Sequence, residues 1–334
     1  MNILIINLGA IGDVIRTTSV LPGLKEKYKN CEIDWVTKKE SFDVLKNNKF
    51  IDKIYTINSI NKIKQKKYDL VVSLDDDFEA CQLASKINSK KIIGAYLKNK
   101  QRIYTEDSSL WFGMGLISKF DKKKADELKA KNKEAYQQIM YKILGLKYKK
   151  QEPMLTLDKK SLNFSKKFAL KNNIKKNDLV IGINTGAGGR WEDKKLSIKK
   201  TAELIDKINK QLQNVKILLF GGPEEKERNN KIKKLIKTKI IDASCNNSLM
   251  EFASLVSLCD ILVTSDSLAL HIGTALKKKI VVFFYVTSAS EIELYNSGIK
   301  IIGKGKDYCS YKTKCDYLPK WDIDEIANGV KKLI

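Results

Sequence analysis

The sequence has no apolar run long enough to cross a membrane. The longest run near its centre, residues 280–286, has seven residues, whereas a membrane-spanning helix needs about 20. The apolar start of the chain, residues 1–6, has no basic leader and continues directly into Gly9 and Asp13, so it does not resemble a signal peptide. We therefore expect a cytoplasmic protein.

Acidic residues are scarce relative to basic ones. The chain has 39 Asp and Glu against 63 Lys and Arg, for a net charge of +24. Such an excess favours an acidic partner, whether nucleic acid, an anionic membrane surface or a phosphorylated glycolipid. Because there is no aromatic-basic RNA signature, zinc-finger spacing or arginine-rich arm, we do not expect nucleic acid. A general bias towards lysine is an alternative explanation of the charge.

Potential metal ligands of the His and Cys type are also few. The chain has one histidine, His271, and six cysteines, which we expect to be reduced in a cytoplasmic protein. Only Cys309 and Cys315 have suggestive spacing, and two cysteines with no nearby histidine are too few for a structural zinc site. We therefore expect no bound metal.

The 334 residues exceed what a single core usually supports, so two domains are expected. Short apolar runs alternate with helical patterns, which predicts parallel sheets with helices on both faces. The periodicity weakens over residues 149–178 around Pro153, where we expect a domain linker. Strands are predicted at 3–6, 33–36, 54–57, 70–74, 91–94, 179–183, 216–220, 240–242, 261–263 and 280–284. Helices are predicted at 14–28, 162–171, 248–258, 268–276 and 323–333.

Residues 264–273 form the stretch around which we expect the site to be organised. A predicted strand ends at Val263, a polar turn follows, and a helix begins near Leu268. Ser265 or Asp266 would cap this helix, whose first N–H groups suit a phosphate. His271 lies about one turn into the helix, on the side that would face such a ligand. Alternatively, these are an ordinary helix start and a structural histidine.

Two further loops follow predicted strands. Residues 7–13 contain Gly9 and Gly12, whose spacing is neither a dinucleotide fingerprint nor a Walker A loop. Their position at the carboxyl end of the first strand is nevertheless where open parallel sheets bind ligands. Residues 184–191 place three glycines in five residues, so their N–H groups can surround an anion, and Arg190 and Lys194 would add positive charge.

These stretches resemble one known family. The sequence Asp-Ser-Leu-Ala-Leu-His at 266–271 resembles the "D-[TS]-G-x-x-H" donor motif of glycosyltransferase family 9, the ADP-heptose heptosyltransferases that build the lipopolysaccharide inner core. Leu268 stands where the family usually has Gly. Residues 3–24, with Pro22, resemble the family's N-terminal Gly-Asp signature, and residues 186–194 resemble its glycine-rich R-W-x-x-K loop.

The resemblance implies an α/β fold of glycosyltransferase B architecture, with two Rossmann-like doubly wound domains facing an interdomain cleft. Residues 1–155 would bind the acceptor, 156–320 would bind the nucleotide sugar, and a helix in 321–334 would cross back to the first domain. The implied reaction is an inverting, metal-independent transfer of heptose from ADP-heptose to a saccharide of lipopolysaccharide core. Transfer to protein, use of another nucleotide sugar, and a non-catalytic binding role remain alternatives.

The resemblance also assigns roles to particular residues. Asp13 would be the catalytic base, although it could equally be a helix N-cap. Gly12, Arg16 and Asp76 would contact the acceptor, and we prefer this polar role for residues 75–77 over binding of a metal. Glu225 would contact the nucleoside, although helix capping explains it nearly as well. The donor-binding set as a whole would be Thr185, Gly186, Arg190, Lys194, Glu225, Ser265, Asp266, Ser267, Leu268 and His271.

No cofactor is implied beyond the nucleotide-sugar donor as co-substrate. The acceptor would be an anionic glycolipid or glycoprotein, and peripheral contact with the inner membrane surface is also considered. The segment 111–145 is predicted to be mostly helical and very basic. Its lysine-rich part, 119–133, is interpreted either as a solvated face or as a rim that meets an anionic acceptor.

Overall fold

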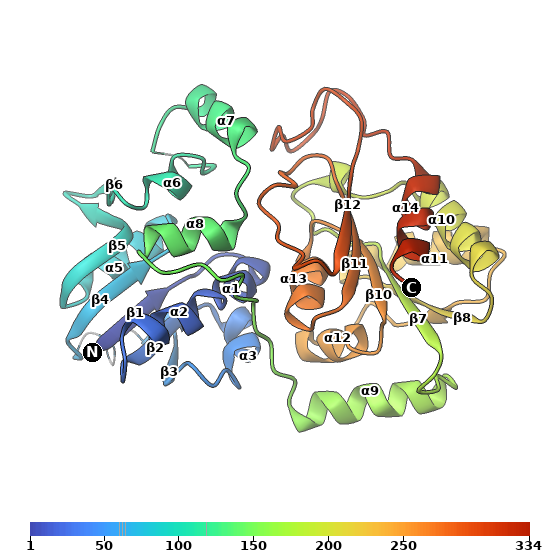
Figure 1. The fold of residues 1–334 in the computed structure, drawn as a ribbon, viewed down its shortest axis with the longest axis horizontal. Helices are drawn as coiled ribbons and strands as arrows, with labels where there is room; N and C mark the ends of the chain where they lie inside the picture. Colours follow the sequence, from blue (N-terminus) through green and yellow to red (C-terminus); the bar gives the residue numbers. More distant parts are fainter. Residues whose placement is uncertain (60, 62, 64, 118) are drawn as a thin grey trace. The chain divides into compact units, whose positions relative to one another are not determined.

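The computed structural model of the chain describes residues 1–59, 61, 63, 65–117 and 119–334. Their contacts divide the chain into two compact units (Figure 1). Unit 1 consists of Met1–Thr156 with Ser290–Glu293, and unit 2 consists of Leu157–Ala289 with Leu294–Ile334. The domain boundary predicted from the sequence falls after residue 155.

Unit 1 is built on a six-stranded sheet in the order β3-β2-β1-β4-β5-β6. All pairs are parallel except β5 with β6. This strand order is that of the Rossmann fold, in which the connections reverse direction between the first and fourth strands. The strands are β1 Asn2–Ile6, β2 Glu32–Thr37, β3 Lys53–Thr56, β4 Tyr68–Ser73, β5 Ser89–Lys98 and β6 Gln101–Tyr104.

The predicted helix 14–28 is divided in two. Helix α1 ends at Thr17 and the next helix begins at Val20. Pro22 has no N–H to donate to the carbonyl of Thr18 and its ring crowds that carbonyl. The hydroxyls of Thr18 and Ser19 instead donate to carbonyls one turn back, which bends the chain. The helices of unit 1 with described bounds include α1 Ile11–Thr17, α2 Val20–Lys27, α3 Phe42–Leu45, α5 Phe78–Lys86, α6 Ser109–Phe112, α7 Lys122–Lys131 and α8 Tyr136–Ile143.

Strand β6 is not among the strands predicted from the sequence. It pairs with β5 through a two-residue turn in which Asn99 and Lys100 have φ values of 51° and 62°. Two successive positive φ values are the conformation of a type I′ hairpin turn, which Asn favours in its first position. The predicted strand 91–94 is therefore longer and continues into a hairpin.

Unit 2 repeats the same topology. Its six strands lie in the order β12-β11-β10-β7-β8-β9 and all pairs are parallel. Counted from β7, this is again the Rossmann order, with the reversal between β7 and β10. The strands are β7 Leu179–Asn184, β8 Val215–Phe220, β9 Ile241–Asp242, β10 Ile261–Ser265, β11 Lys279–Phe284 and β12 Gly298–Ile302.

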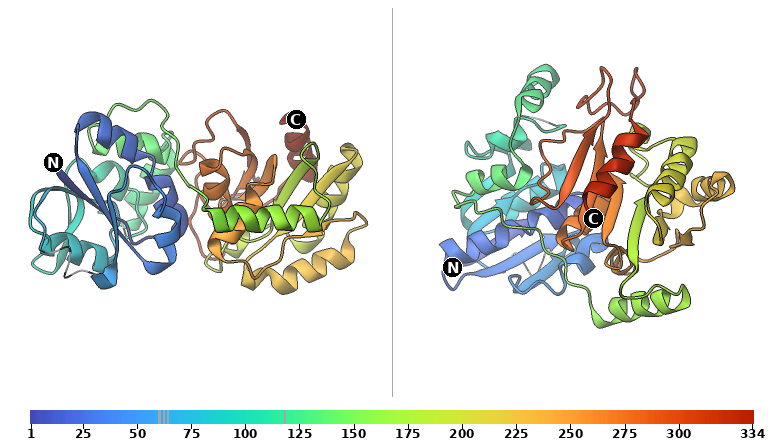
Figure 2. Two further views of the ribbon diagram at one scale, coloured as in Figure 1. Left: turned by 90° about the horizontal axis from the view of Figure 1, so that it is seen from below. Right: turned by 45° about the vertical axis from the view of Figure 1, so that its right-hand side comes forward.

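Helices cover both faces of the unit 2 sheet. The helices of unit 2 are α9 Lys159–Lys171, α10 Ile198–Gln211, α11 Lys226–Leu235, α12 Leu249–Val256, α13 Leu268–Ala275 and α14 Ile323–Lys332. In Figures 1 and 2, α10, α11 and α14 lie on one face of the strands and α12 and α13 on the other. Alternate residues of β7 such as Ile181 and Ile183 share a core with α10 and α14, as the two-residue period of a strand requires.

The last helix belongs to unit 2, where α14 packs against α10 and β11. That it crosses back to the first domain stays a prediction. Its apolar face, with Ile326 and Val330 fully buried, joins the core of that unit. Burial of this face beside its own sheet is what holds the helix there.

The structure confirms the predicted α/β class with two Rossmann-like domains, and every predicted strand is present. In the described part of the chain, no helix combines the length and apolar content that crossing a membrane demands.

Candidate functional site

Each sheet has a topological switch point where ligands of doubly wound folds bind. In unit 1 it lies at the carboxyl ends of β1 and β4, and in unit 2 at those of β7 and β10. Most of the predicted residues come from the loops at these two edges. Glu225 is an exception, because it follows β8.

Lys194 and Asp266 form an ion pair at the unit 2 switch point. The ammonium of Lys194 donates to Asp266 Oδ2 at 2.9 Å, and the side chains are only 8% and 17% exposed. The hydroxyl of Thr287, after β11, donates to the same carboxylate oxygen at 2.6 Å. The loops that follow β7, β10 and β11 are therefore tied together at one carboxylate. Thr287 is not among the donor-binding residues predicted from the sequence.

Asp266 stays ionised despite its burial. Burial alone raises the pKa of a carboxyl group. The nearby ammonium of Lys194, the neighbouring His271 and the hydrogen bond from Thr287 outweigh that effect and lower the pKa of Asp266 far below its ordinary value. His271 Nε2 lies 4.0 Å from Asp266 Oδ1. A permanent negative charge repels phosphate, so Asp266 is suited to hold Lys194 in place and not to touch a phosphate itself.

The prediction that Ser265 or Asp266 caps α13 is wrong. Ser267 is the N-cap residue, and no side chain makes the capping bond. The Ser267 hydroxyl instead shares a hydrogen bond of 2.9 Å with Thr264. Leu268 is the first residue of the helix and is partly exposed. The first N–H groups of a helix have no acceptor within the helix, so this end suits an anion.

Asn184 joins the two central loops of unit 2. Its amide nitrogen donates to the carbonyl of Gly186 at 2.7 Å and lies 3.0 Å from the Thr264 hydroxyl and 3.3 Å from that of Ser267. It is 8% exposed. In the sequence, Asn184 is only the first residue of the glycine loop. The structure shows that it fixes the start of that loop against the N-terminus of α13.

The glycine loop passes close to Glu225. A Cβ on Gly186 would lie 2.8 Å from the Glu225 carboxylate, so only glycine fits there without displacement. Glu225 Oε2 accepts from the Gly222 N–H at 3.0 Å, and Lys195 Nζ lies 3.8 Å from Oε1. The predicted capping role of Glu225 is thus present. Thr185 is buried and its hydroxyl lies within hydrogen-bonding distance of Phe220 and Asn229, which directs it into the fold.

Two cations lie around one indole ring beside this loop. The guanidinium of Arg190 is 4.6 Å from the Trp191 ring centroid, and the ammonium of Lys194 is 4.5 Å from it. Arg190 is exposed, whereas Lys194 is buried. The aromatic ring favours nearby positive charge, so the loop presents one fixed cation and one accessible cation.

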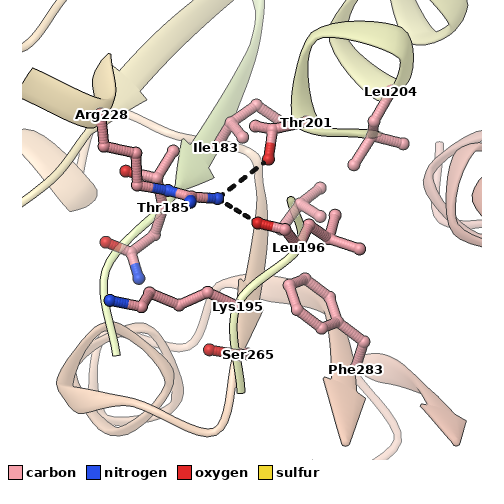
Figure 3. A pocket seen from close by; sticks show the side chains of 11 residues that line it. Ile183, Thr185, Lys195, Leu196, Thr201, Leu204, Arg228, Ser265 and Phe283 are labelled. Atoms are coloured by element: carbon pink, nitrogen blue, oxygen red, sulfur yellow. Dashed lines mark hydrogen bonds between the residues drawn. The ribbon is translucent and has the colours of Figure 1, made fainter. Parts of the chain in front are cut away.

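A small pocket lies beside the same loops (Figure 3). Its polar lining includes Lys195, Arg228 and Ser265. Figure 3 shows the Arg228 guanidinium reaching the Leu196 carbonyl and the Thr201 hydroxyl. Ser265, at the end of β10, is 2% exposed. Lys195 and Arg228 are absent from the predicted set, because nothing in a single lysine or arginine along a helical pattern distinguishes it from a surface residue.

In unit 1, Asp13 and Arg16 form an ion pair on the first helix after β1. Arg16 Nη2 lies 2.7 Å from Asp13 Oδ1, and the side chain of Asp13 is 42% exposed while that of Arg16 is 12% exposed. The N-cap of this helix is Ala10, so the alternative of Asp13 as an N-cap is wrong. Gly12 is buried in the first turn of the helix.

Aromatic rings hold Arg16. Its guanidinium carbon lies 3.9 Å from the ring centroid of Tyr136 and 5.2 Å from that of Trp111. The two rings meet edge to face at 4.9 Å. The Tyr136 hydroxyl is 2.7 Å from that of Thr17, so α1, α6 and α8 together fix the guanidinium.

Asp76 does not join this group in any contact of the described residues. It lies after β4, where its Oδ2 accepts from the Tyr104 hydroxyl at 3.2 Å. The neighbouring Asp75 accepts from the Leu8 N–H at 2.9 Å, so it supports the loop after β1. Burial raises the pKa of both Asp75 and Asp76. No cluster of at least three His, Cys, Asp or Glu side chains placed to hold a metal ion occurs among the described residues.

The two edges offer complementary chemistry. Unit 2 combines cations, backbone N–H groups and a glycine loop, which suits an anion such as a diphosphate. Unit 1 presents a half-exposed carboxylate held by an arginine, which suits removal of a proton from a hydroxyl group.

Comparison with known proteins identifies related chains. Residues 57–321 match the model of a family described as glycosyltransferase family 9 (heptosyltransferase). Lipopolysaccharide heptosyltransferase 1 of Campylobacter coli is 26% identical over 362 residues, covering 100% of this chain and 99% of the relative.

Solved structures show the same fold. A glycosyl transferase family 9 protein from Veillonella parvula aligns with a TM-score of 0.79 and 18% identity, covering 99% of this chain and 96% of that chain. The ADP-heptose lps heptosyltransferase II of E. coli aligns with a TM-score of 0.68 and 17% identity, covering 100% and 98%. These likenesses confirm the predicted glycosyltransferase B fold.

Proposed function

The chain belongs to glycosyltransferase family 9, the heptosyltransferases, and we propose that it transfers heptose from ADP-heptose to a saccharide acceptor of lipopolysaccharide core. Two of the relatives reported above are named as lipopolysaccharide heptosyltransferases, and one of these two is also named for ADP-heptose. The observation that carries the proposal is the Lys194–Asp266–Thr287 cluster beside the N-terminus of α13. This arrangement fixes a buried cation where a diphosphate would bind.

The proposed reaction is a single displacement at the anomeric carbon. An acceptor hydroxyl transfers its proton to the carboxylate of Asp13 as its oxygen forms a bond to that carbon. The bond from the carbon to the diphosphate oxygen breaks at the same time, and ADP leaves with its electron pair. Because attack and departure occur on opposite faces, the anomeric configuration inverts.

Unit 2 would stabilise the departing ADP. Negative charge grows on the diphosphate as the bond breaks, and fixed donors act most strongly where charge develops. The ammonium of Lys194 is already oriented by Asp266, so it needs little rearrangement. The exposed guanidinium of Arg190 and the first N–H groups of α13 would complete the set.

We propose that these groups stabilise the departing diphosphate in place of a divalent cation. Two cations near one ring supply the charge that a metal ion gives in metal-dependent transferases. Turnover should therefore be the same after dialysis against EDTA. Loss of turnover that magnesium or manganese restores would contradict metal independence.

Donor identity is tested by binding. The melting temperature of the protein should rise with ADP and ADP-heptose, since a ligand that binds only the folded state stabilises it. GDP- and UDP-sugars serve as the matched controls. Incubation with ADP-heptose and truncated lipopolysaccharide should release ADP and add one heptose by mass spectrometry. A larger shift with UDP or GDP sugars, or transfer only to protein, would overturn the proposed substrates.

A further inference from the structure

The segment from α6 to the start of α7 exposes apolar and basic side chains together. We propose that this segment docks unit 1 on an anionic phospholipid surface. We name it the basic-apolar patch, and it consists of Leu110, Leu116, Ile117, Lys119, Phe120, Lys122, Lys123 and Lys124. In Figure 1, α6 and α7 lie beyond the end of the strands of unit 1, on the side of β6.

The apolar part of the patch is unusually open to solvent. Leu110 and Leu116 are 52% and 51% exposed, and Ile117 and Phe120 are each 42% exposed. A single exposed leucine is normal on a protein surface, but several large apolar side chains close together mark a contact surface. The turn between α6 and α7 thus holds apolar area that the fold of unit 1 does not bury.

The lysines give the patch one sign of charge. Lys119, Lys122, Lys123 and Lys124 are all exposed, and Asp121 is the only acidic residue between positions 110 and 124. The Asp121 carboxylate accepts from the Lys124 N–H as the N-cap of α7. Lys122 pairs with Asp126 at 2.6 Å, but an ion pair this exposed is weak.

This combination fits an anionic membrane surface better than another occupant. Apolar side chains enter the boundary between headgroups and acyl chains, while lysines stay at the level of the anionic headgroups. Lys119 and Phe120 place a positive charge beside an apolar side chain in this way, since the Lys119 ammonium lies 5.9 Å from the ring of the exposed Phe120. The excess of 63 basic over 39 acidic residues in the whole chain adds long-range attraction to the same surface.

The patch is joined to the candidate base. Trp111 follows Leu110 in α6, and its ring lies 5.2 Å from the Arg16 guanidinium that pairs with Asp13. If the proposed function holds, a lipid-linked acceptor in the same membrane would reach unit 1 close to Asp13. The docking itself requires neither donor nor acceptor, so it can be tested separately from the transfer reaction.

The test is sedimentation of the full chain with vesicles. Vesicles of phosphatidylethanolamine and phosphatidylglycerol are compared with vesicles of phosphatidylcholine alone. The protein should bind the anionic vesicles, and binding should weaken as salt is added, because salt screens exposed charges. Failure to bind anionic vesicles, or equal binding to both kinds, would overturn the proposal and leave the patch to a protein partner or a second copy of the chain.

Two variants test separately how the apolar side chains and the lysines of the patch contribute to vesicle binding. Leu116→Ser with Ile117→Ser removes apolar area, and Lys122→Gln with Lys123→Gln and Lys124→Gln removes charge. Each should lower the vesicle partition coefficient on the order of tenfold or more. Circular dichroism and the melting temperature verify that both variants fold, since all these side chains are exposed.

Helix α9 supplies the matched control. It also exposes Leu162 and Leu170, at 39% and 78%, and several lysines, but they are spread along the helix. Leu162→Ser with Leu170→Ser, and Lys166→Gln with Lys167→Gln and Lys171→Gln, should leave vesicle binding within about twofold, because dispersed residues add little to a local patch. An equal loss in the α9 variants would show a general effect of charge or hydrophobicity and would contradict the assigned patch.

Discussion

The guanidinium of Arg16 lies 2.7 Å from Asp13 Oδ1, one helical turn further along α1. The same guanidinium stacks on Tyr136. This relationship sets the direction of the carboxylate that we propose as the base. Arg16 is therefore a positioning residue in this account, and its effect should depend on the planar shape of the guanidinium.

Replacement of Arg16 tests that role. Arg16→Lys keeps the charge but cannot stack on Tyr136 and form the same directed pair with Asp13. We expect kcat to fall on the order of a hundredfold, as for a displaced reacting group, while ADP binding is unchanged. Tyr136→Phe is the matched control, because it keeps the ring beneath the guanidinium and loses only the hydroxyl. Full activity of Arg16→Lys would show that charge alone is needed.

Lys194 should support both stability and donor binding. Lys194→Met leaves the ionised Asp266 without its main partner, which costs about 3 kcal/mol for a buried pair. Thr287→Val removes one hydrogen bond to the same carboxylate and should cost about 1 kcal/mol. ADP affinity, measured by calorimetry, should fall strongly in the first variant and little in the second.

The control for Lys194 is Lys231→Met, on the exposed surface of α11. It should match the wild type in both chemical unfolding and ADP affinity. If Lys194→Met binds ADP with wild-type affinity, Lys194 is not part of the donor site, whatever the effect of the substitution on stability.

Asn184 should control the shape of the glycine loop. Asn184→Asp keeps the size of the side chain but loses the amide that donates to the Gly186 carbonyl. We expect the free energy of unfolding to fall by about 1–3 kcal/mol, since buried acceptors are left without a donor. ADP affinity should also fall, because the loop is no longer held against α13. If the variant is less stable but binds ADP with normal affinity, the glycine loop does not contribute to donor binding.

The titration of Asp76 should lower the free energy of unfolding as pH rises. Burial raises its pKa in the folded protein, so the folded state binds the proton more tightly than the unfolded state does. Its contribution to stability is therefore greatest at low pH, and it decreases as pH rises from about 3.9, the ordinary pKa of Asp, through the raised value. Asp76→Asn removes this titration and keeps an oxygen to accept from Tyr104.

Urea unfolding of both proteins between about pH 4 and about pH 7 measures the difference. Asp76→Asn should gain stability relative to the wild type as pH rises. The paired variant Asp75→Asn should be less stable than wild type, since Asp75 accepts two backbone N–H groups through its two oxygens. Its difference from wild type should nevertheless become smaller as pH rises, because burial also raises the pKa of Asp75. A constant difference between Asp76→Asn and wild type across this range would contradict the predicted titration.

The architecture was largely predictable, because it follows from local patterns. Short apolar runs marked the parallel strands, and the polar loops after them marked the ligand-binding edges. The break at Thr18 and Ser19 was missed although Pro22 signals it. The β5–β6 hairpin was missed because Asn99 and Lys100 do not form one of the strongest turn pairs. Both features depend on backbone conformation, which apolar periodicity does not report.

Site residues could be predicted from the sequence only where they belong to a recognisable motif. Lys194 and Asp266 were named from sequence, but their pairing with each other required the packing of β7 against β10. Asn184 and Thr287 are polar residues of ordinary type, and their hydrogen bonds to Gly186 and Asp266 become visible only in the folded structure. The burial of α14 in unit 2 likewise depends on which core has room for its apolar face, and that is a tertiary property.

Asp13→Asn tests the central claim most directly. The substitution keeps the size of the side chain and an oxygen facing Arg16, but an amide cannot accept the proton from an acceptor hydroxyl. The account predicts that ADP affinity stays within about twofold while heptose transfer from ADP-heptose falls on the order of a thousandfold, the contribution of a positioned base. Transfer at the wild-type rate would contradict the assignment of Asp13 as the base and the reaction proposed from it.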